Sequence, residues 1–390
     1  MMTSSPKMMA KVDSSRWIGK IEQGPTFPSI VLVGGLHGNE QSGITAIERV
    51  FSKINSENIP VLGNIYALRG NLKAIQSSQR FIDHDLNRLW TPTKVDAAKA
   101  GRLGVSETDE LLDILSISEA IIYNSKADVT FVDLHTTSSD SSPFMVIDDT
   151  IRNRRIAQSV PVTLVLGVLE QLEGTLSGYL SNYGVTTLVF EAGQHDALSS
   201  IDRHEAATWM LLDALKVVDT SNVDMKAYRA LLEASTKSKP KIVETRLRFG
   251  LKDEDRFKME PGFSNFSSVK KGQLLAHYNG HKISAAFTGK IFMPLYQKQG
   301  DDGFFLTKRI APFWLRFSEW LRRVNADRLV HYLPGVKKHP ESVNTYVINK
   351  NIASLKTMQI LHLLGFRKEK KVGKTLLVSR RAFDLKGPWD

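Results

Sequence analysis

The sequence predicts an α/β fold: a mixed sheet with helices on both faces, then a small all-β domain and a basic α+β segment. Two patterns support this. Short apolar runs rich in β-branched residues alternate with helical patterns, as in sheets covered on both faces. From residue 242 onward, short β-like runs are separated by recurring glycines instead. We expect the α/β domain over 1–235, the β domain over 242–306 and the basic segment over 307–390.

The first elements follow from the spacing of apolar residues. Residues 29–33 (SIVLV) form a buried strand candidate that runs into a glycine pair. Apolar positions three and four apart then predict a helix around 44–54, and 64–68 is a second strand candidate. A helix is expected over 106–124, because Ser106 can cap it and its first turn is acidic.

Later elements follow the same logic. Strands are expected over 129–134 and 186–190, and a helix over 203–218. Residues 237–241 (KSKPK) are interpreted as a linker. The β stretch that follows resembles the barrel-sandwich hybrid of lipoyl and biotinyl domains, although no carrier lysine is recognisable. The last segment begins with an aromatic, basic helix candidate and continues as a strand-helix-strand pattern over 345–379.

Composition narrows the class of protein. The 390 residues include no cysteine, which excludes a disulfide framework, a Cys-ligated metal and a thiol nucleophile. The net charge of +11 is uneven: residues 305–390 carry 18 Lys+Arg against 6 Asp+Glu, whereas residues 1–304 carry 34 against 35. This asymmetry indicates a separate basic module. Neither a signal peptide nor an apolar run of membrane-spanning length is recognisable, so we expect a soluble cytoplasmic protein without membrane contact.

Two histidines follow predicted strands. His37 and Glu40 stand in the turn GGLHGNE after the first strand, and glycines there permit close approach of the backbone. His135 follows the strand VTFVDL, and the ends of parallel strands meet at one edge of a sheet. Such nitrogen and oxygen donors suit zinc, although a lone His-x-x-Glu pair can equally be hydrogen-bonded in a loop. Asp133 either orients His135 or caps a loop.

Further polar residues accompany these. Glu191 follows the strand TTLVF and can act as a general base and acid, or can cap a helix or form an ion pair. Arg80, Asn87 and Arg88 belong to RFIDHDLNR; arginines bind carboxylates by a two-pronged fork, although spacing alone suggests ordinary surface residues. We expect the other histidines, such as His195, to be surface or supporting residues.

HGNE, DLNR, DLH and FEAG, in this order, resemble the succinylglutamate desuccinylase/aspartoacylase family, which is related to the zinc carboxypeptidases. The glycine-rich segment through 293–296 also resembles the β domain of that family. The resemblance implies a zinc-carboxypeptidase-like fold over about residues 1–306. It also implies a metallohydrolase that cleaves non-peptide amides, namely a deacylase whose expected substrates are N-acyl amino acids.

The resemblance assigns roles position by position. It implies one Zn²⁺ held by His37, Glu40 and His135, with Glu191 as general base/acid toward a zinc-activated water. It makes Arg80 the residue that stabilises the oxyanion. The remaining implied roles are substrate-binding ones, at Asn87, Arg88 and Tyr296.

The sequence also departs from the family pattern. Ser181 stands near the point where aspartoacylase has a further substrate-binding arginine, so recognition of a second carboxylate is in question. Two alternatives stay open. The first is a metallocarboxypeptidase acting on short peptides, which would use the same zinc and carboxylate clamp. The second is a protein that binds nucleic acid or another polyanion through the basic segment 307–390. The oligomeric state is not predicted.

Overall fold

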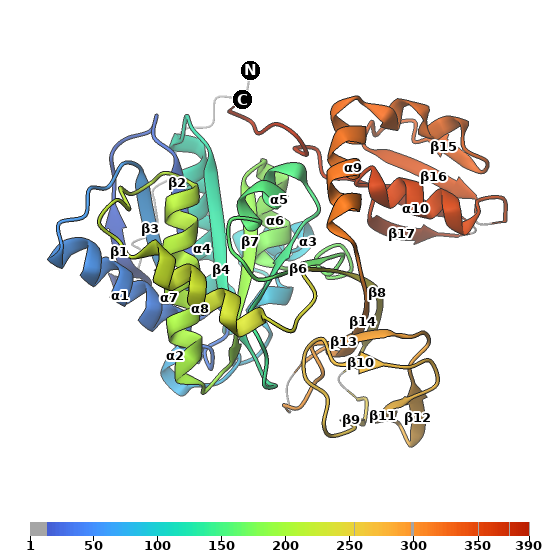
Figure 1. Ribbon diagram of the computed structural model, residues 1–390, viewed down its shortest axis with the longest axis horizontal. Coiled ribbons are helices and arrows are strands. Elements are labelled where there is room, and N and C mark those ends of the chain that lie inside the picture. Colours follow the sequence, from blue (N-terminus) through green and yellow to red (C-terminus); the bar gives the residue numbers. More distant parts are fainter. Residues whose placement is uncertain (1–13, 253, 298–299, 350, 374, 390) are drawn as a thin grey trace.

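One large mixed sheet runs through most of the molecule (Figure 1). The structure is a computed structural model that describes residues 14–252, 254–297, 300–349, 351–373 and 375–389. In spatial order the eleven strands are β1 (Trp17–Ile21), β3 (Asn64–Arg69), β2 (Ser29–Gly34), β4 (Val129–Thr137), β7 (Thr186–Gln194), β5 (Phe144–Ile147), β6 (Thr163–Leu166), β8 (Ile242–Gly250), β14 (Asp302–Arg309), β13 (Gly289–Phe292) and β10 (Ser268–Val269). The four strands expected in the α/β part are β2, β3, β4 and β7, which lie together and run parallel.

Helices cover both faces of this sheet, as predicted. They are α1 (Ser42–Ser56), α2 (Leu72–Ser77), α3 (Pro92–Lys99), α4 (Thr108–Asn124), α5 (Ile151–Ala157), α6 (Leu176–Leu180), α7 (Leu198–Ala214) and α8 (Met225–Thr236). Strand β2 shows the reason: Ile30 and Leu32 pack into the core under α1 and α7, whereas Val31 and Val33 pack into the core under α4. Because successive side chains of a strand point to opposite faces, a fully apolar strand needs cover on both sides.

Two expected helix boundaries are wrong. Helix α4 begins at Thr108 with Glu107 at its N-cap, so Ser106 does not cap it; the Ser106 hydroxyl donates to the Asp83 carboxylate instead. Helix α7 begins at Leu198 and ends at Ala214, and Lys216 follows with a left-handed φ of 54°. Cap residues compete for partners that are distant in the chain, so local sequence does not fix them.

The small β domain shares the large sheet. Strands β9 (Phe257–Met259), β11 (Leu274–Tyr278) and β12 (His281–Ser284) form a separate three-stranded sheet. It packs on β13 and β14 through a cluster of buried side chains that includes Met259, Leu275, Ile291 and Phe304. However, β8 pairs in parallel with β6, so residues 237–241 connect two parts of one continuous sheet. We keep the boundaries 1–235, 242–306 and 307–390 as a proposal.

The C-terminal segment has its own sheet and core. Helix α9 (Pro312–Arg323) leads to β15 (Val336–Lys338), β16 (Thr345–Asn349), α10 (Leu355–Leu363), β17 (Lys368–Val372) and β18 (Thr375–Ser379). The four strands form an antiparallel sheet in the order β15-β16-β18-β17. This segment also contains the 3₁₀ helix η4 (Ala326–Tyr332). Among the described residues outside it, the 3₁₀ helices are η1 (Ser14–Arg16), η2 (Leu86–Arg88) and η3 (Ser181–Tyr183). Tyr346, Ile348, Leu361 and Phe366 belong to the buried core of this segment.

Buried ion pairs join this segment to the α/β part. Arg322 of α9 lies 3.1 Å from Asp149 Oδ2 and 3.0 Å from Asp384 Oδ1, and its side chain is fully buried. Arg367 also pairs with Asp149. Figure 1 shows the segment in orange and red beside the α/β part, to which its last residues return. In the described part of the chain, no helix has both the length and the apolar character needed to cross a membrane.

Candidate metal centre and active site

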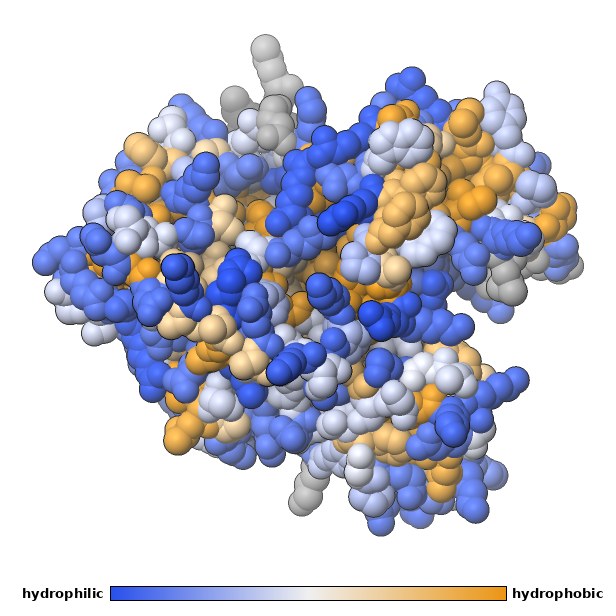
Figure 2. Space-filling view, viewed as in Figure 1, coloured by the Kyte–Doolittle hydropathy of each residue, from blue (hydrophilic) through white to orange (hydrophobic). Residues whose placement is uncertain are grey.

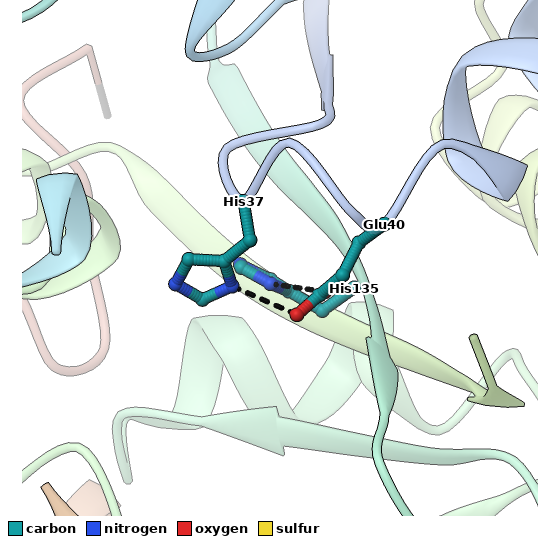
Figure 3. Close-up of side chains that lie close together, drawn as sticks. All are labelled: His37, Glu40 and His135. Carbon is teal, nitrogen blue, oxygen red and sulfur yellow. Dashed lines mark hydrogen bonds and ion pairs between the residues drawn. The ribbon is translucent and has the colours of Figure 1, made fainter. Parts of the chain in front are cut away.

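The turn after β2 carries the first two candidate ligands, and its shape depends on glycine. A Cβ atom on Gly38 would lie 2.0 Å from the carbonyl carbon of Ala74, so no other residue fits there. The Gly38 amide donates to the carbonyl of Arg80 at 3.2 Å, and the Glu40 amide donates to the carbonyl of His37 at 3.0 Å. These bonds fold the turn back so that His37 and Glu40 point at the same place (Figure 3).

Strand pairing brings the third candidate to this turn. Strands β2 and β4 are parallel neighbours with Gly34 opposite Leu134, so His135 lies beside the turn. The Nδ1 atoms of His37 and His135 lie 2.9 and 3.0 Å from the two carboxylate oxygens of Glu40. One ligand atom from each residue can be chosen so that all three lie within 4.8 Å of one another, and all three residues are buried. The structure therefore brings together His37, Glu40 and His135, although the two histidines are 98 residues apart in the sequence.

This donor set fits zinc. Two imidazole nitrogens and one carboxylate oxygen are ligands that zinc prefers, and three protein ligands leave a position for solvent, as in catalytic sites. A carboxylate also lies behind each imidazole: Asp85 Oδ1 is 3.1 Å from Nε2 of His37, and Asp133 Oδ2 is 2.8 Å from Nε2 of His135. The second contact has ion-pair distance without the angles of a hydrogen bond. Such carboxylates orient metal-binding imidazoles and leave Nδ1 for the metal.

Asp133 therefore stands where it can orient His135, the first of the two roles left open by the sequence. Asp85 was not identified from the sequence, although it lies within the DLNR motif. Burial raises the pKa of Asp85, but His37 and Arg80 outweigh burial and hold that pKa well below its usual range. The carboxylate is thus ionised at neutral pH and can accept from the His37 ring.

Glu191 lies next to this cluster because β7 is the neighbour of β4. The two strands are parallel, and Glu191 is directly opposite His135 in their register. Its side chain is buried, and among the described residues its Oε2 atom has no hydrogen-bond partner. Burial raises the pKa of Glu191 to about 8; His135 and Arg80 oppose this shift, while Glu40 and Asp133 add to it. A carboxylate with a free oxygen and a pKa near neutrality can both accept and donate a proton.

Arg80 lies between the metal cluster and the adjoining loop. Its Nη1 atom is 3.4 Å from Glu40 Oε1, and its Nη2 atom is 2.9 Å from Asp85 Oδ2. The loop after Arg80 is fixed by a residue distant in the chain: the Glu107 carboxylate accepts from the backbone amides of Ile82 at 2.7 Å and His84 at 3.1 Å. Glu107, at the N-cap position of α4, thus positions the segment that contains Arg80.

Arg88 and Asn87 lie at the end of the same loop, in η2. Asn87 Oδ1 accepts from the Leu176 amide at 2.9 Å, which leaves its NH₂ group for other partners. Arg88 extends toward the β domain, where its Nη2 atom is 3.0 Å from Asp302 Oδ2. Arg88 and Arg80 line one small cavity of about 80 Å³. The other residues that line it are Thr136, Thr137, Ser138, Ser139, His195, Met293, Pro294, Leu295, Gln297, Gly300, Asp301 and Asp302.

The structure does not bring Tyr296 to this cavity, although its neighbours Leu295 and Gln297 line it. The Tyr296 hydroxyl donates to the Glu260 carbonyl at 2.8 Å and accepts from the Phe263 amide at 3.1 Å. Ser181 lies elsewhere, lining a different cavity together with Arg380 and Arg381.

His195 is a cavity residue that the sequence placed only among surface or supporting histidines. Its Nδ1 atom lies 2.7 Å from Thr136 Oγ1, and its Nε2 atom lies 3.3 Å from Gln297 Oε1. It therefore links the end of β4 to the β domain. The signal available in the sequence was its position four residues after Glu191, at the end of the same strand.

Comparisons with known proteins point to one family. Residues 26–215 match the model of the succinylglutamate desuccinylase/aspartoacylase catalytic domain. A succinylglutamate desuccinylase from Pseudoalteromonas atlantica is 25% identical over 276 residues, which cover 67% of this chain and 75% of the relative. A second one, from Pseudomonas paraeruginosa, is 27% identical over 107 residues, covering 27% of this chain and 30% of that protein.

Solved structures share the fold. A succinylglutamate desuccinylase/aspartoacylase from Rhodobacter sphaeroides superimposes with a TM-score of 0.55 at 17% identity, over 76% of this chain and 88% of that one. For the succinylglutamate desuccinylase of Vibrio parahaemolyticus, the TM-score is 0.53 at 16% identity, over 75% and 85% of the two chains. Residues 26–215 of this chain are thus a catalytic domain of the succinylglutamate desuccinylase/aspartoacylase family.

Proposed function

We propose that this chain is a zinc-dependent deacylase that hydrolyses the amide bond of an N-acyl amino acid or a similar small amide bearing a carboxylate. One observation carries the proposal: His37, Glu40 and His135 converge within 4.8 Å, and Glu191 lies opposite His135 on the adjacent strand. A metal-ligand set beside a buried carboxylate with a free oxygen is the arrangement that metal-assisted hydrolysis requires. The family of the catalytic domain supports the same reaction class.

The proposed roles follow from the positions of the side chains. A zinc ion bound by the three ligands would supply Lewis acidity to water and to the carbonyl oxygen. Glu191 takes the proton of the attacking water and later gives it to the leaving amine. Arg80 stabilises the developing oxyanion, a contribution of ~3–4 kcal/mol for a well-placed donor. Asn87 and Arg88 hold the substrate carboxylate, and Tyr296 is kept as a proposed substrate-binding residue of the β domain.

The same machinery could serve a metallocarboxypeptidase acting on short peptides; the β-domain residues that line the cavity favour the deacylase. The cavity has about 80 Å³, and β-domain residues such as Pro294 and Leu295 line it. The Leu295 amide donates to the carbonyl of Gly303 in β14 at 3.0 Å, and β14 pairs with β8, so these residues are tied to the large sheet. A peptide with several residues would have to displace them.

Metal analysis coupled to a hydrolysis panel tests the proposal. The purified protein is expected to contain about one zinc per chain by mass spectrometry, the stoichiometry of a single three-ligand site. It should release free amino acid from N-acetyl and N-succinyl amino acids. Dipeptides and tripeptides belong to the same panel, because their hydrolysis would indicate a carboxypeptidase and not a deacylase. Zinc-loaded protein that cleaves none of the amides would contradict the proposal.

A second candidate function, binding of a nucleic acid or another polyanion through 307–390, is favoured by the orientation of α9. This helix turns Leu315, Ser318 and Arg322 inward and presents aromatic rings to solvent. Trp314 and Trp320 are 46% and 56% exposed, and hydrophobic atoms gather over α9 in Figure 2. Exposed rings beside arginines can stack on bases and neutralise phosphates.

Retention on single-stranded nucleic acid at increasing salt tests this second candidate. The double variant Trp314→Ala/Trp320→Ala should elute at lower salt than the unmodified protein, because two exposed stacking rings are lost. Tyr123→Ala is the matched control, since Tyr123 is 71% exposed but lies on α4. Unchanged elution of the double variant would remove this candidate.

A further inference from the structure

The guanidinium of Arg88 is already occupied by carboxylates of its own chain. Its Nη2 atom lies 3.0 Å from Asp302 Oδ2, and its Nε atom lies 3.2 Å from Asp301 Oδ2. The third nitrogen, Nη1, donates to the Asn87 carbonyl at 3.0 Å. Nη1 and Nη2 therefore have acceptors, whereas Nε has the Asp301 carboxylate at ion-pair distance without the angles of a hydrogen bond.

These two aspartates are fixed to different degrees. Asp302 opens β14, where it pairs with Gly250 of β8, and its Oδ1 atom also accepts from Arg248 Nε at 2.5 Å. The Asp302 side chain is 13% exposed, whereas that of Asp301 is 43% exposed. Asp302 is thus built into the sheet and held by two arginines. Asp301 stands at the rim, and it lines the same cavity as Arg80 and His195.

The charges at this corner of the cavity cancel. Among the described residues at this corner, Arg88 and Arg248 face Asp301 and Asp302, so these arginines carry no surplus charge for a second substrate carboxylate. An incoming carboxylate must displace an aspartate from Arg88, and the displaced group then lies close to a like charge. Ser181, near the position where an additional arginine would be expected, lines a different cavity. In the part of the chain that the structure describes, this corner therefore offers no free cation to an acidic side chain.

We infer that Asp301 and Asp302 are specificity-determining residues that exclude acidic substrates, so the site takes N-acyl derivatives of neutral or basic amino acids. This inference rests on the proposed deacylase function. The α-carboxylate of such a substrate needs one contact, which the Asn87 amide provides together with Arg88 after Asp301 swings away. An acidic side chain would need a second cation, and the two aspartates already neutralise the arginines at this corner. A basic side chain finds Asp301 as a partner at the rim.

Substrate ratios test the inference. The zinc-loaded protein is assayed for kcat/KM with N-acetyl-leucine, N-acetyl-lysine and N-acetyl-glutamate. We expect the first two to exceed the third by about tenfold or more, the value of one charged hydrogen bond. Asp301→Asn and the double variant Asp301→Asn/Asp302→Asn should raise kcat/KM for N-acetyl-glutamate about tenfold relative to N-acetyl-leucine. Asp202→Asn, an exposed aspartate on α7, is the matched control.

A binding measurement keeps the result separate from catalysis. Calorimetric titration with free leucine, lysine and glutamate should show the weakest binding for glutamate, and Asp301→Asn should strengthen glutamate binding selectively. If no amide is hydrolysed, the proposed function fails, while this titration still decides the inference. A wild-type preference for glutamate in either assay would overturn it. So would an unchanged ratio in both aspartate variants.

Discussion

At the scale of single residues, the site depends on carboxylates that differ in their partners. Glu40 touches both histidines, and Asp85 and Asp133 lie behind the histidine rings. Glu191 instead keeps an oxygen without a partner in the described part of the chain. Under the proposed function, the same side-chain chemistry is divided between holding a metal, orienting its ligands and moving a proton.

Replacement of Glu191 by Gln tests the proton-transfer role. The amide keeps the size of the side chain but cannot accept a proton, so kcat for amide hydrolysis should fall ~10²–10⁴-fold. Zinc content, measured by mass spectrometry, should stay at the wild-type level. Glu57→Gln, an exposed glutamate just after α1, is the control. A Glu191→Gln enzyme with nearly normal turnover would rule out the role.

A second carboxylate with a raised pKa, the partly exposed Glu170, predicts a pH-dependent stability. Burial raises its pKa from 4.5 to about 7, with Asp148 and Asp149 adding to the shift and Arg367 opposing it. Between pH 4.5 and about pH 7, the folded protein therefore binds more protons at Glu170 than the unfolded chain does. The free energy of unfolding falls as pH rises through this range.

Denaturant unfolding at pH 5 and pH 7.5 measures this effect. Glu170→Gln cannot ionise, so the stability of the variant relative to the wild type should be greater at pH 7.5 than at pH 5. The direction follows from the raised pKa of Glu170. An equal difference at both pH values would show that Glu170 does not titrate in this range.

The sequence alone predicted the residues of the His37, Glu40 and His135 cluster but not all of their partners. His37, His135 and Glu191 could be identified because each stands at the end of an apolar strand, and parallel strands align their ends. Asp301 and Asp302 gave no such signal: they are more than 200 residues from Arg88, and their pairing depends on where β14 joins the sheet. Tyr296 remains a prediction from family resemblance.

At the scale of elements, the turn between β2 and α1 is the most demanding piece of backbone. The carbonyl carbon of Ala74 occupies the space that a Cβ atom on residue 38 would need. Gly35 has a left-handed φ of 74°. The turn places His37 and Glu40 only if both glycines keep their backbone conformations.

Gly38→Ala should therefore damage both stability and metal binding. The added methyl group must push α2 away, at a cost of ~1–3 kcal/mol in the free energy of unfolding. Zinc retention after dialysis against a chelator should fall, since His37 and Glu40 move with the turn. Gly104→Ala is a matched control, because no atom lies within 4 Å of its Cβ position. Wild-type metal retention in Gly38→Ala would show that the turn can relax.

Strand character predicted the central strands well and the peripheral ones poorly. Strands β2, β3, β4 and β7 are apolar because the sheet is covered on both faces there. Strand β17 has the sequence KEKKV, and all five residues are exposed at a sheet edge, so no apolar pattern marks it. The aromatic spacing of α9 is typical of a core-facing helix, yet Arg322 and Ser318 take the buried side, because their partners lie in the α/β part.

At the scale of the whole molecule, buried charges join the C-terminal segment to the α/β part. Arg322→Ala would leave Asp149 and Asp384 short of a partner, so the free energy of unfolding should fall by ~3–5 kcal/mol. The neighbouring Arg323 pairs with Glu319 at the surface, and Arg323→Ala should cost ~0–1 kcal/mol. Chemical denaturation of both variants measures the contrast. Equal losses would mean that the buried pairs do not secure the segment.

The continuity of the large sheet has a consequence for how small molecules reach the site. Because β8 pairs with both β6 and β14, the β domain cannot swing like a lid without breaking backbone hydrogen bonds along a strand. Opening must come from rotation of side chains at the rim, of which Asp301 is the most solvent-accessible charged one among those described. The width of the entrance is thus fixed when the chain folds, and under the proposed function substrates would be selected there by shape and charge.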